Sequence, residues 1–115
     1  MPHTSANDLT KQALKLFAAL GFEAWRQNNA AVYDEKNKTY RAGSAKRGVA
    51  DILGYHKSTA TVLACEIKVG RDQLSEHQKD FLLGVKQAGG VALVIRTSAD
   101  LEQFAKTKQS NFEIE

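Results

Sequence analysis

Two acidic residues and a lysine lie in two stretches of the sequence that are predicted to be neighbouring strands. Asp51 lies in the predicted strand over residues 49–55, and Glu66 and Lys68 lie in the predicted strand over residues 60–69. Only about five residues separate the two strands, which favours an antiparallel hairpin. Alternate residues of a strand share a face, so Glu66 and Lys68 point to the same side. The register between Asp51 and Glu66 stays open at this point, but the two carboxylates can meet across the hairpin.

Such a pair suits metal-assisted hydrolysis of a phosphodiester. Neighbouring carboxylates repel each other and resist ionisation unless a cation is present. Mg²⁺ binds oxygen ligands, commonly one or two carboxylates with waters and a substrate phosphate. A lysine beside them can orient or deprotonate a water and stabilise charge on phosphorus. The alternative for Glu66 and Lys68 is an exposed ion pair on a polar sheet face, which stabilises little, and Asp51 alone also suits the start of a strand.

The surrounding pattern predicts one α/β domain that holds this hairpin in a mixed sheet flanked by helices. Apolar spacing and capping signals predict helices over residues 7–20, from 75 to about 88, and from 98 to about 106. Further strands are predicted over 22–26, 30–33 and 91–96, and a polar, basic, flexible loop over 34–48. The core is expected over about 7–107, with 1–5 and 108–115 loose.

Three helix starts carry recognisable capping signals. Ser75 and Gln78 have the spacing of a capping box, so Gln78 has a structural role that can coexist with a role at the site. Asp8 suits the first turn of the first helix, where the helix dipole favours an acid. Ser98 is expected to cap the last helix.

Composition excludes several function classes. The 115 residues include 16 Lys and Arg, 13 Asp and Glu, a single cysteine and three histidines, for a net charge of +3. One cysteine cannot form an internal disulfide or a cysteine-rich zinc site. The longest apolar run, residues 91–95, is far shorter than the roughly 20 residues of a membrane span, and no leader peptide is expected. A compact, intracellular domain remains, and its mild positive charge permits a nucleic-acid partner.

Several ordered segments together resemble a known nuclease family. The segments are Phe22 to Asn28, Gly48-Val49-Ala50-Asp51-Ile52, Glu66-Ile67-Lys68, Leu74-Ser75 with Gln78, and Gly90-Val91-Ala92. They resemble the virus-type replication-repair nuclease group (VRR-NUC), a branch of the PD-(D/E)XK superfamily, over roughly residues 8 to 97. Ala50 stands where the superfamily has its namesake proline.

The resemblance implies a restriction-endonuclease-like αβββαβ core and a Mg²⁺ or Mn²⁺ site. Asp51, Glu66 and the backbone carbonyl of Ile67 would hold the metal, Lys68 would assist the attacking water, and Gln78 would contact the site. Asp8 is the loose equivalent of an acid, more often Glu, that members place on the first helix. Small members are typically viral homodimers that cut branched DNA such as four-way junctions, which implies a role in phage replication, recombination or repair in the host cytoplasm.

Basic residues precede the predicted site. Lys36, Lys38, Arg41, Lys46 and Arg47 lead toward Asp51, and Arg26 follows Trp25 on an earlier strand. We expect the basic residues to contact DNA phosphates, and the alternative is a solvated loop. Trp25 is expected to pack in the fold, with stacking on a base as the alternative.

These observations favour a metal-dependent DNA endonuclease. One rival is a nucleic-acid-binding module on the same fold that binds DNA and cuts nothing. A second rival is an interaction protein whose charged sheet face is only solvated.

Overall fold

A mixed four-stranded sheet organises the protein. The computed structural model describes residues 5–27, 32–41 and 46–113. The elements run in the order α1 (Ala6–Ala19), β1 (Phe22–Arg26), β2 (Val32–Asp34), β3 (Thr39–Arg41), β4 (Ile52–His56), β5 (Val62–Ile67), α2 (Glu76–Gln87), β6 (Val91–Ile95) and α3 (Ser98–Thr107). The main sheet has the order β1-β4-β5-β6, antiparallel except for the parallel pair β5–β6. The predicted α/β class and the predicted hairpin, β4–β5, are confirmed.

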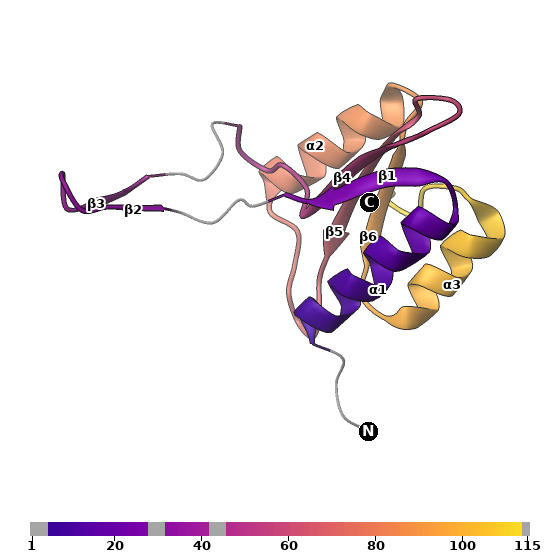
Figure 1. Ribbon diagram of the computed structural model, residues 1–115, viewed down its shortest axis with the longest axis horizontal. Helices are drawn as coiled ribbons and strands as arrows, with labels where there is room; N and C mark the ends of the chain where they lie inside the picture. The colour runs from indigo at the N-terminus through magenta and orange to yellow at the C-terminus, as the bar shows by residue number, and fades with distance from the viewer. Residues whose placement is uncertain (1–4, 28–31, 42–45, 114–115) are drawn as a thin grey trace.

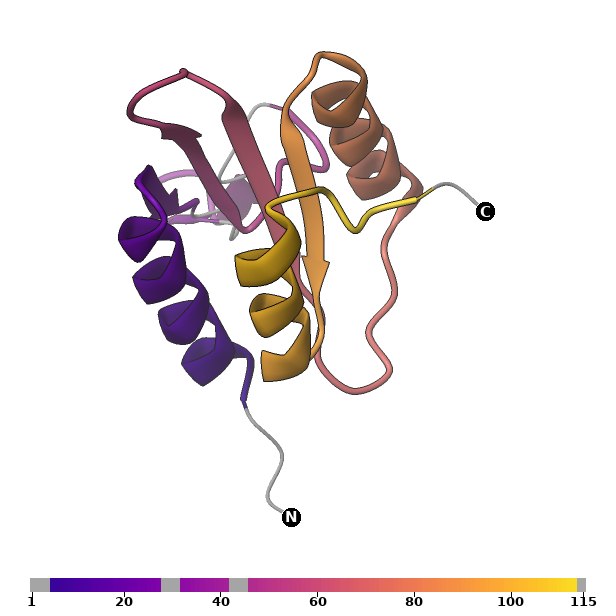
Figure 2. The same ribbon diagram turned by 90° about the vertical axis from the view of Figure 1, so that its right-hand side faces the viewer.

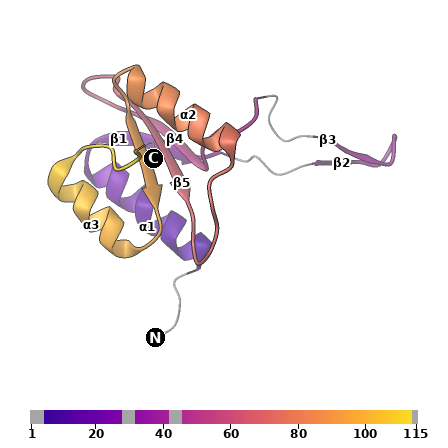
Figure 3. The ribbon, with the colours of Figure 1, turned by 180° about the vertical axis from the view of Figure 1, so that it is seen from behind.

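Helices cover both faces of this sheet. Figures 1 and 3, taken from opposite sides, show α1 and α3 on one side and α2 on the other. Leu9, Ala13 and Phe17 repeat every four residues and form the fully buried stripe of α1. They pack with Ile52 and Cys65 on the α1–α3 side. Side chains alternate between the two faces of a strand, so the strand residues next to Ile52 and Cys65, including Ala64, lie on the α2 side.

The predicted flexible loop over residues 34–48 is wrong in part. Residues 39–41 form β3, which pairs antiparallel with β2 through Val32↔Arg41, Tyr33↔Tyr40 and Asp34↔Thr39. The β-forming residues of the two segments outweigh the surrounding charge, and a turn over 35–38 joins them. Figure 1 shows this hairpin extending away from the sheet and helices. Residues 30 and 31 of the predicted second strand, and residues 42–45 of the loop, lie outside the described ranges.

The expectation of a loose segment over 108–115 is wrong at residues 110–112, which bind the free edge of β6, whereas residues 1–4, 114 and 115 of the expected loose ends lie outside the described ranges. Ser110 Oγ accepts from the Ala92 N–H at 2.9 Å. The Asn111 amide both accepts from Val94 N–H at 2.7 Å and donates to Val94 O at 2.8 Å, as a neighbouring strand would. Phe112 is buried in the α2-side core. In Figure 2 this yellow segment crosses in front of β6, so it protects an edge strand.

The helix starts differ slightly from expectation. The capping box of Ser75 and Gln78 is confirmed at the start of α2. At α3 the N-cap is Thr97, with Asp100 completing its capping box, and Ser98 is the first helical residue. In the described ranges, none of the helices combines the length and the apolar character needed to cross a bilayer.

Candidate metal centre

The structure brings Asp51 and Glu66 together at the point where β4 begins. The backbone N–H of Asp51 donates to Glu66 Oε1 at 3.2 Å, and Asp51 Oδ2 accepts from the backbone N–H of Ile67 at 2.8 Å. Ile52 lies opposite Cys65 in the β4–β5 pair, so one further step along the register puts Asp51 opposite Glu66. At this point carboxylate oxygens of Asp51 and Glu66, rather than backbone carbonyls, accept the hydrogen bonds of the backbone N–H groups. The pairing of Asp51 with Glu66, which the sequence left open, is thereby established.

Glu66 is an unusual glutamate because its carboxyl group is removed from water. Its side chain is 0% exposed. Its Oε2 is the buried side-chain polar atom without a hydrogen-bond partner in the part of the chain that the structure describes. Burial first, and then the negative charge of Asp51, raise the pKa of Glu66 from 4.5 to about 8. A buried charged group without a partner is costly, so this oxygen favours a proton or a cation.

Lys68 contributes positive charge at the same end of β5. It lies two residues after Glu66, so strand alternation places the two side chains on the same face of the sheet. Its side chain is half-buried. Its charge lowers the pKa of Glu66, but less than burial and Asp51 raise it. Its backbone N–H donates to Ile95 O at 3.0 Å, which continues the parallel pairing past the end of β5.

The backbone supplies one further oxygen. In an extended strand, the N–H and C=O of one residue point to the same edge. Because the Ile67 N–H donates to Asp51, the Ile67 carbonyl is directed to the Asp51 side of β5 as well. The described geometry is therefore compatible with Ile67 as a backbone ligand.

Gln78 is occupied by the capping box. Its Oε1 accepts from the Ser75 N–H at 2.9 Å, and its own N–H donates to Ser75 Oγ at 3.1 Å. Gly48 lies against the same helical turn, with φ at +79°. A Cβ at Gly48 would overlap the backbone carbonyl of His77 and lie 2.8 Å from Gln78 N. The segment that leads into Asp51 therefore rests on the start of α2, and this close approach requires glycine.

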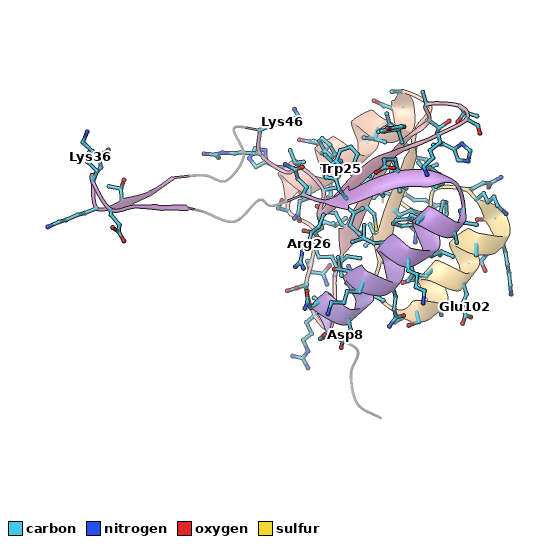
Figure 4. All side chains as sticks on the ribbon, viewed as in Figure 1. Asp8, Trp25, Arg26, Lys36, Lys46 and Glu102 are labelled. Atoms are coloured by element: carbon cyan, nitrogen blue, oxygen red, sulfur yellow. The ribbon has the colours of Figure 1, made fainter. Side chains whose placement is uncertain are left out.

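Two residues expected near the site lie elsewhere. Asp8 is exposed in the first turn of α1, where its N–H donates to Ser5 Oγ at 3.0 Å, and α1 packs on the opposite sheet face from Glu66. Arg26 donates from Nη1 to Asn7 Oδ1 at 2.7 Å. Figure 4 shows Trp25 and Arg26 on opposite sides of β1. The structure therefore does not join Asp8 to the carboxylate pair, and it directs Arg26 toward α1.

The predicted phosphate-binding residues divide into two groups. Lys46 and Arg47 are exposed and precede Asp51 by only a few residues. Lys36 and Lys38 are exposed in the β2–β3 turn, and Figure 4 shows Lys36 at the far end of the hairpin from Lys46. Arg41 ends β3, and its side chain lies outside what the structure describes. Lys46 and Arg47 are thus the basic residues of this set that are closest to Asp51 in the sequence, and Lys46 lines a pocket with Val62 and Phe81.

No protein-family model and no curated protein matches the sequence.

The donor atoms themselves fit a hard divalent cation that retains water. Among the described residues, no group of three or more His, Cys, Asp or Glu side chains gathers as a metal site. Two carboxylates, one backbone carbonyl and several waters are instead a coordination set typical of Mg²⁺. The unpartnered Glu66 Oε2 is the observation that favours this fit, because a cation would satisfy it.

Sequence reasoning missed one feature of this face. Trp25 was expected to pack in the fold, but it is 44% exposed, and its ring lies 6.5 Å from that of Tyr55, which is equally exposed. The face of Tyr55 could have been predicted, because Tyr55 lies two residues after Leu53 and therefore on the same side of β4. Cys65, by contrast, is buried, and burial with the charges of Asp51 and Glu66 raises the pKa of its thiol.

Proposed function

We propose that this protein is a Mg²⁺- or Mn²⁺-dependent DNA endonuclease of the PD-(D/E)XK type. The observation that carries the proposal is the buried Glu66 Oε2 without a partner, held beside Asp51 and within the field of Lys68. A buried ion pair with only a structural role would be expected to give both carboxylate oxygens a partner, because an uncompensated buried charge is costly. The ordered motifs that resemble VRR-NUC domains support the same conclusion.

The chain's own groups divide the chemistry among them. Asp51, Glu66 and the Ile67 carbonyl would hold the cation, which when bound supplies Lewis acidity and lowers the pKa of a coordinated water. The Ile67 N–H fixes the Asp51 carboxylate in place, so little reorganisation is needed during the reaction. Lys68 would hold positive charge near the phosphate as negative charge develops on its oxygens, and would assist the attacking water.

The substrate that we propose is branched DNA, cut by a homodimer. Lys46 and Arg47 would neutralise phosphates of the strand that enters the site, and such contacts carry position and little sequence information. Two copies related by two-fold symmetry would present two carboxylate pairs to a symmetric substrate such as a four-way junction. A role in phage replication, recombination or repair follows from the resemblance.

A cleavage assay tests the proposal. Labelled four-way junction, flap, duplex and single-stranded DNA are incubated with Mg²⁺, Mn²⁺ or EDTA. We expect metal-dependent cutting by the wild type and by a Lys106→Ala control on the far face, and loss of at least about 100-fold in Lys68→Ala, since one electrostatic contact to the transition state is worth that much. Equal cutting by Lys68→Ala would refute the assigned site. Binding without cutting under every metal would favour the non-catalytic binding module.

A further inference from the structure

The exposed aromatic and large aliphatic side chains form one strip on the face that carries the carboxylate pair. Among the residues whose side chains the structure describes, which leave out those of residues 32–34, 40 and 41, the exposed large hydrophobic residues are Trp25, Tyr55 and Val62, at 44%, 44% and 47%. Val62 is opposite Tyr55 across β4–β5, and Trp25 contacts Tyr55 edge-on at 6.5 Å. Single exposed apolar residues need no explanation, but a contiguous group does.

This strip lies where α2 leaves the sheet uncovered. α2 packs over β5 and β6, whereas the corresponding face of β1 and β4 carries Trp25 and Tyr55. Strand alternation puts Ala64 and Glu66 of β5 on the same side as Val62, and Ala64 is part of the α2-side core. The aromatic strip and the carboxylates are therefore on the same face of the sheet.

The strip is close to the site. Trp25 is opposite Leu53, and Leu53 follows Asp51 by two residues. Strand rise and strand spacing then give about 8 Å between the Cα atoms of Trp25 and Asp51, and Tyr55 is about 13 Å from Asp51 along β4. A nucleotide next to the phosphate at the carboxylate pair would lie over these rings.

Charge separates the part of the surface that suits a phosphate from the part that suits a base. Lys68 lies at the carboxylate end of this face, two residues after Glu66, whereas Glu23 is exposed opposite Tyr55 at the aromatic end. A carboxylate there disfavours a phosphate, but aromatic faces bind any base by stacking. We infer that Trp25 and Tyr55 form a platform for an unpaired base adjacent to the phosphate bound at the carboxylates.

This inference rests on the proposed function and specifies its substrate. A base in an intact duplex is stacked on its neighbours and cannot lie on the platform. The protein is therefore expected to prefer DNA with unpaired nucleotides beside the cut, as at a flap, a gap or an opened junction, over continuous duplex.

The chain contains one tryptophan, so tryptophan emission, excited at a wavelength that tyrosine does not absorb, reports on Trp25 alone. The full chain in EDTA is titrated with a single-stranded oligonucleotide, the same strand with abasic positions, and a blunt duplex, while the anisotropy of labelled DNA measures saturation. We expect saturable quenching by the single strand, and weak quenching by the abasic strand and the duplex. Trp25→Leu should weaken single-strand binding about 5- to 150-fold, the range that one stacked base contributes, with duplex affinity unchanged. Trp25→Phe, the matched control, should retain most of the affinity.

Several results would overturn the inference. Unchanged Trp25 emission at saturating single-stranded DNA, equal affinity of Trp25→Leu, or failure of the protein to bind single-stranded DNA would each do so. A blue shift that depends on protein concentration without DNA would assign the strip to contact with a second copy. If the wild type cleaves DNA but Trp25 emission does not change, the platform is refuted and the proposed nuclease function stands. If DNA quenches Trp25 emission but no metal supports cleavage, the nuclease function is refuted and the platform stands.

Discussion

Replacing Glu66 by glutamine should stabilise the metal-free protein at alkaline pH. The oxygen of the introduced amide would accept from the Asp51 N–H as Glu66 Oε1 does, and the amide N–H would donate toward the Asp51 carboxylate. The amide thus reproduces the protonated glutamic acid and removes the repulsion between the buried Glu66 carboxylate and the half-buried Asp51 carboxylate. Most core substitutions destabilise a protein, so a gain here would be diagnostic.

The size of the gain follows from the pKa of Glu66. That pKa is 4.5 in ordinary surroundings and about 8 in the fold. Between these values the folded chain keeps a proton that the unfolded chain has lost, so the free energy of unfolding falls as pH rises, and above about 8 the fall is complete. At about 1.4 kcal/mol per pKa unit, the glutamine variant should gain about 3 kcal/mol on the wild type between pH 6 and pH 9. This corresponds to roughly 12 °C in unfolding midpoint.

Urea unfolding in EDTA at pH 6 and at pH 9 measures this difference. Glu102→Gln, on the exposed face of α3, is the matched control and should follow the wild type at both values. Adding Mn²⁺ should stabilise the wild type and leave the Glu66→Gln variant unchanged, because a ligand stabilises only the state that binds it. A Glu66→Gln variant that is less stable than the wild type at pH 9 would refute the description of Glu66 as a buried, repelled carboxyl group.

Three further predictions concern the parts that hold the site. Gly48→Ala should lose about 2 kcal/mol or more of unfolding free energy, because its Cβ would meet the His77 carbonyl at a positive φ; loss confined to a few tenths would contradict that close contact. Phe112→Ala should lose about 3 kcal/mol of unfolding free energy, because it leaves a cavity in the α2-side core. Hydrogen exchange should then become faster at the Ala92 and Val94 amides. Unchanged exchange would show that the C-terminal segment does not protect β6. Cys65 should resist thiol reagents in the native protein and react once it is unfolded, since only the thiolate is nucleophilic; rapid native labelling would contradict its burial.

Much of the fold follows from local signals in the sequence. Leu9, Ala13 and Phe17 repeat at helical spacing, and Ser75 with Gln78 marks the start of α2, so these elements could be predicted. The β2–β3 hairpin could not, because its charged residues outnumber the few β-formers that pair. The binding of Asn111 to Val94 joins residues that no local pattern relates, so the C-terminal segment was also missed.

The sequence predicted which residues form the site, but not how they contact one another or how deeply they are buried. Strand alternation joined Glu66 to Lys68, but the contact of Glu66 with Asp51 depends on register, which neither strand encodes alone. Burial of Glu66 was invisible because it depends on the packing of α2. The failed expectation for Trp25 has the same cause, since nothing in β1 reveals that α2 stops short of it.

The central claim is that Asp51 and Glu66 bind a divalent cation together. Calorimetric titration of Mn²⁺ into the metal-free protein, in buffers of different ionisation enthalpy, measures both the ions bound and the protons released. We predict one ion per chain and nearly one proton released at pH 7, falling toward zero above pH 9, because Glu66 must give up the proton that it holds up to a pKa of about 8. Asp51→Asn should abolish binding. Absence of Mn²⁺ binding, binding without proton release at pH 7, or equal binding by Asp51→Asn would contradict the claim.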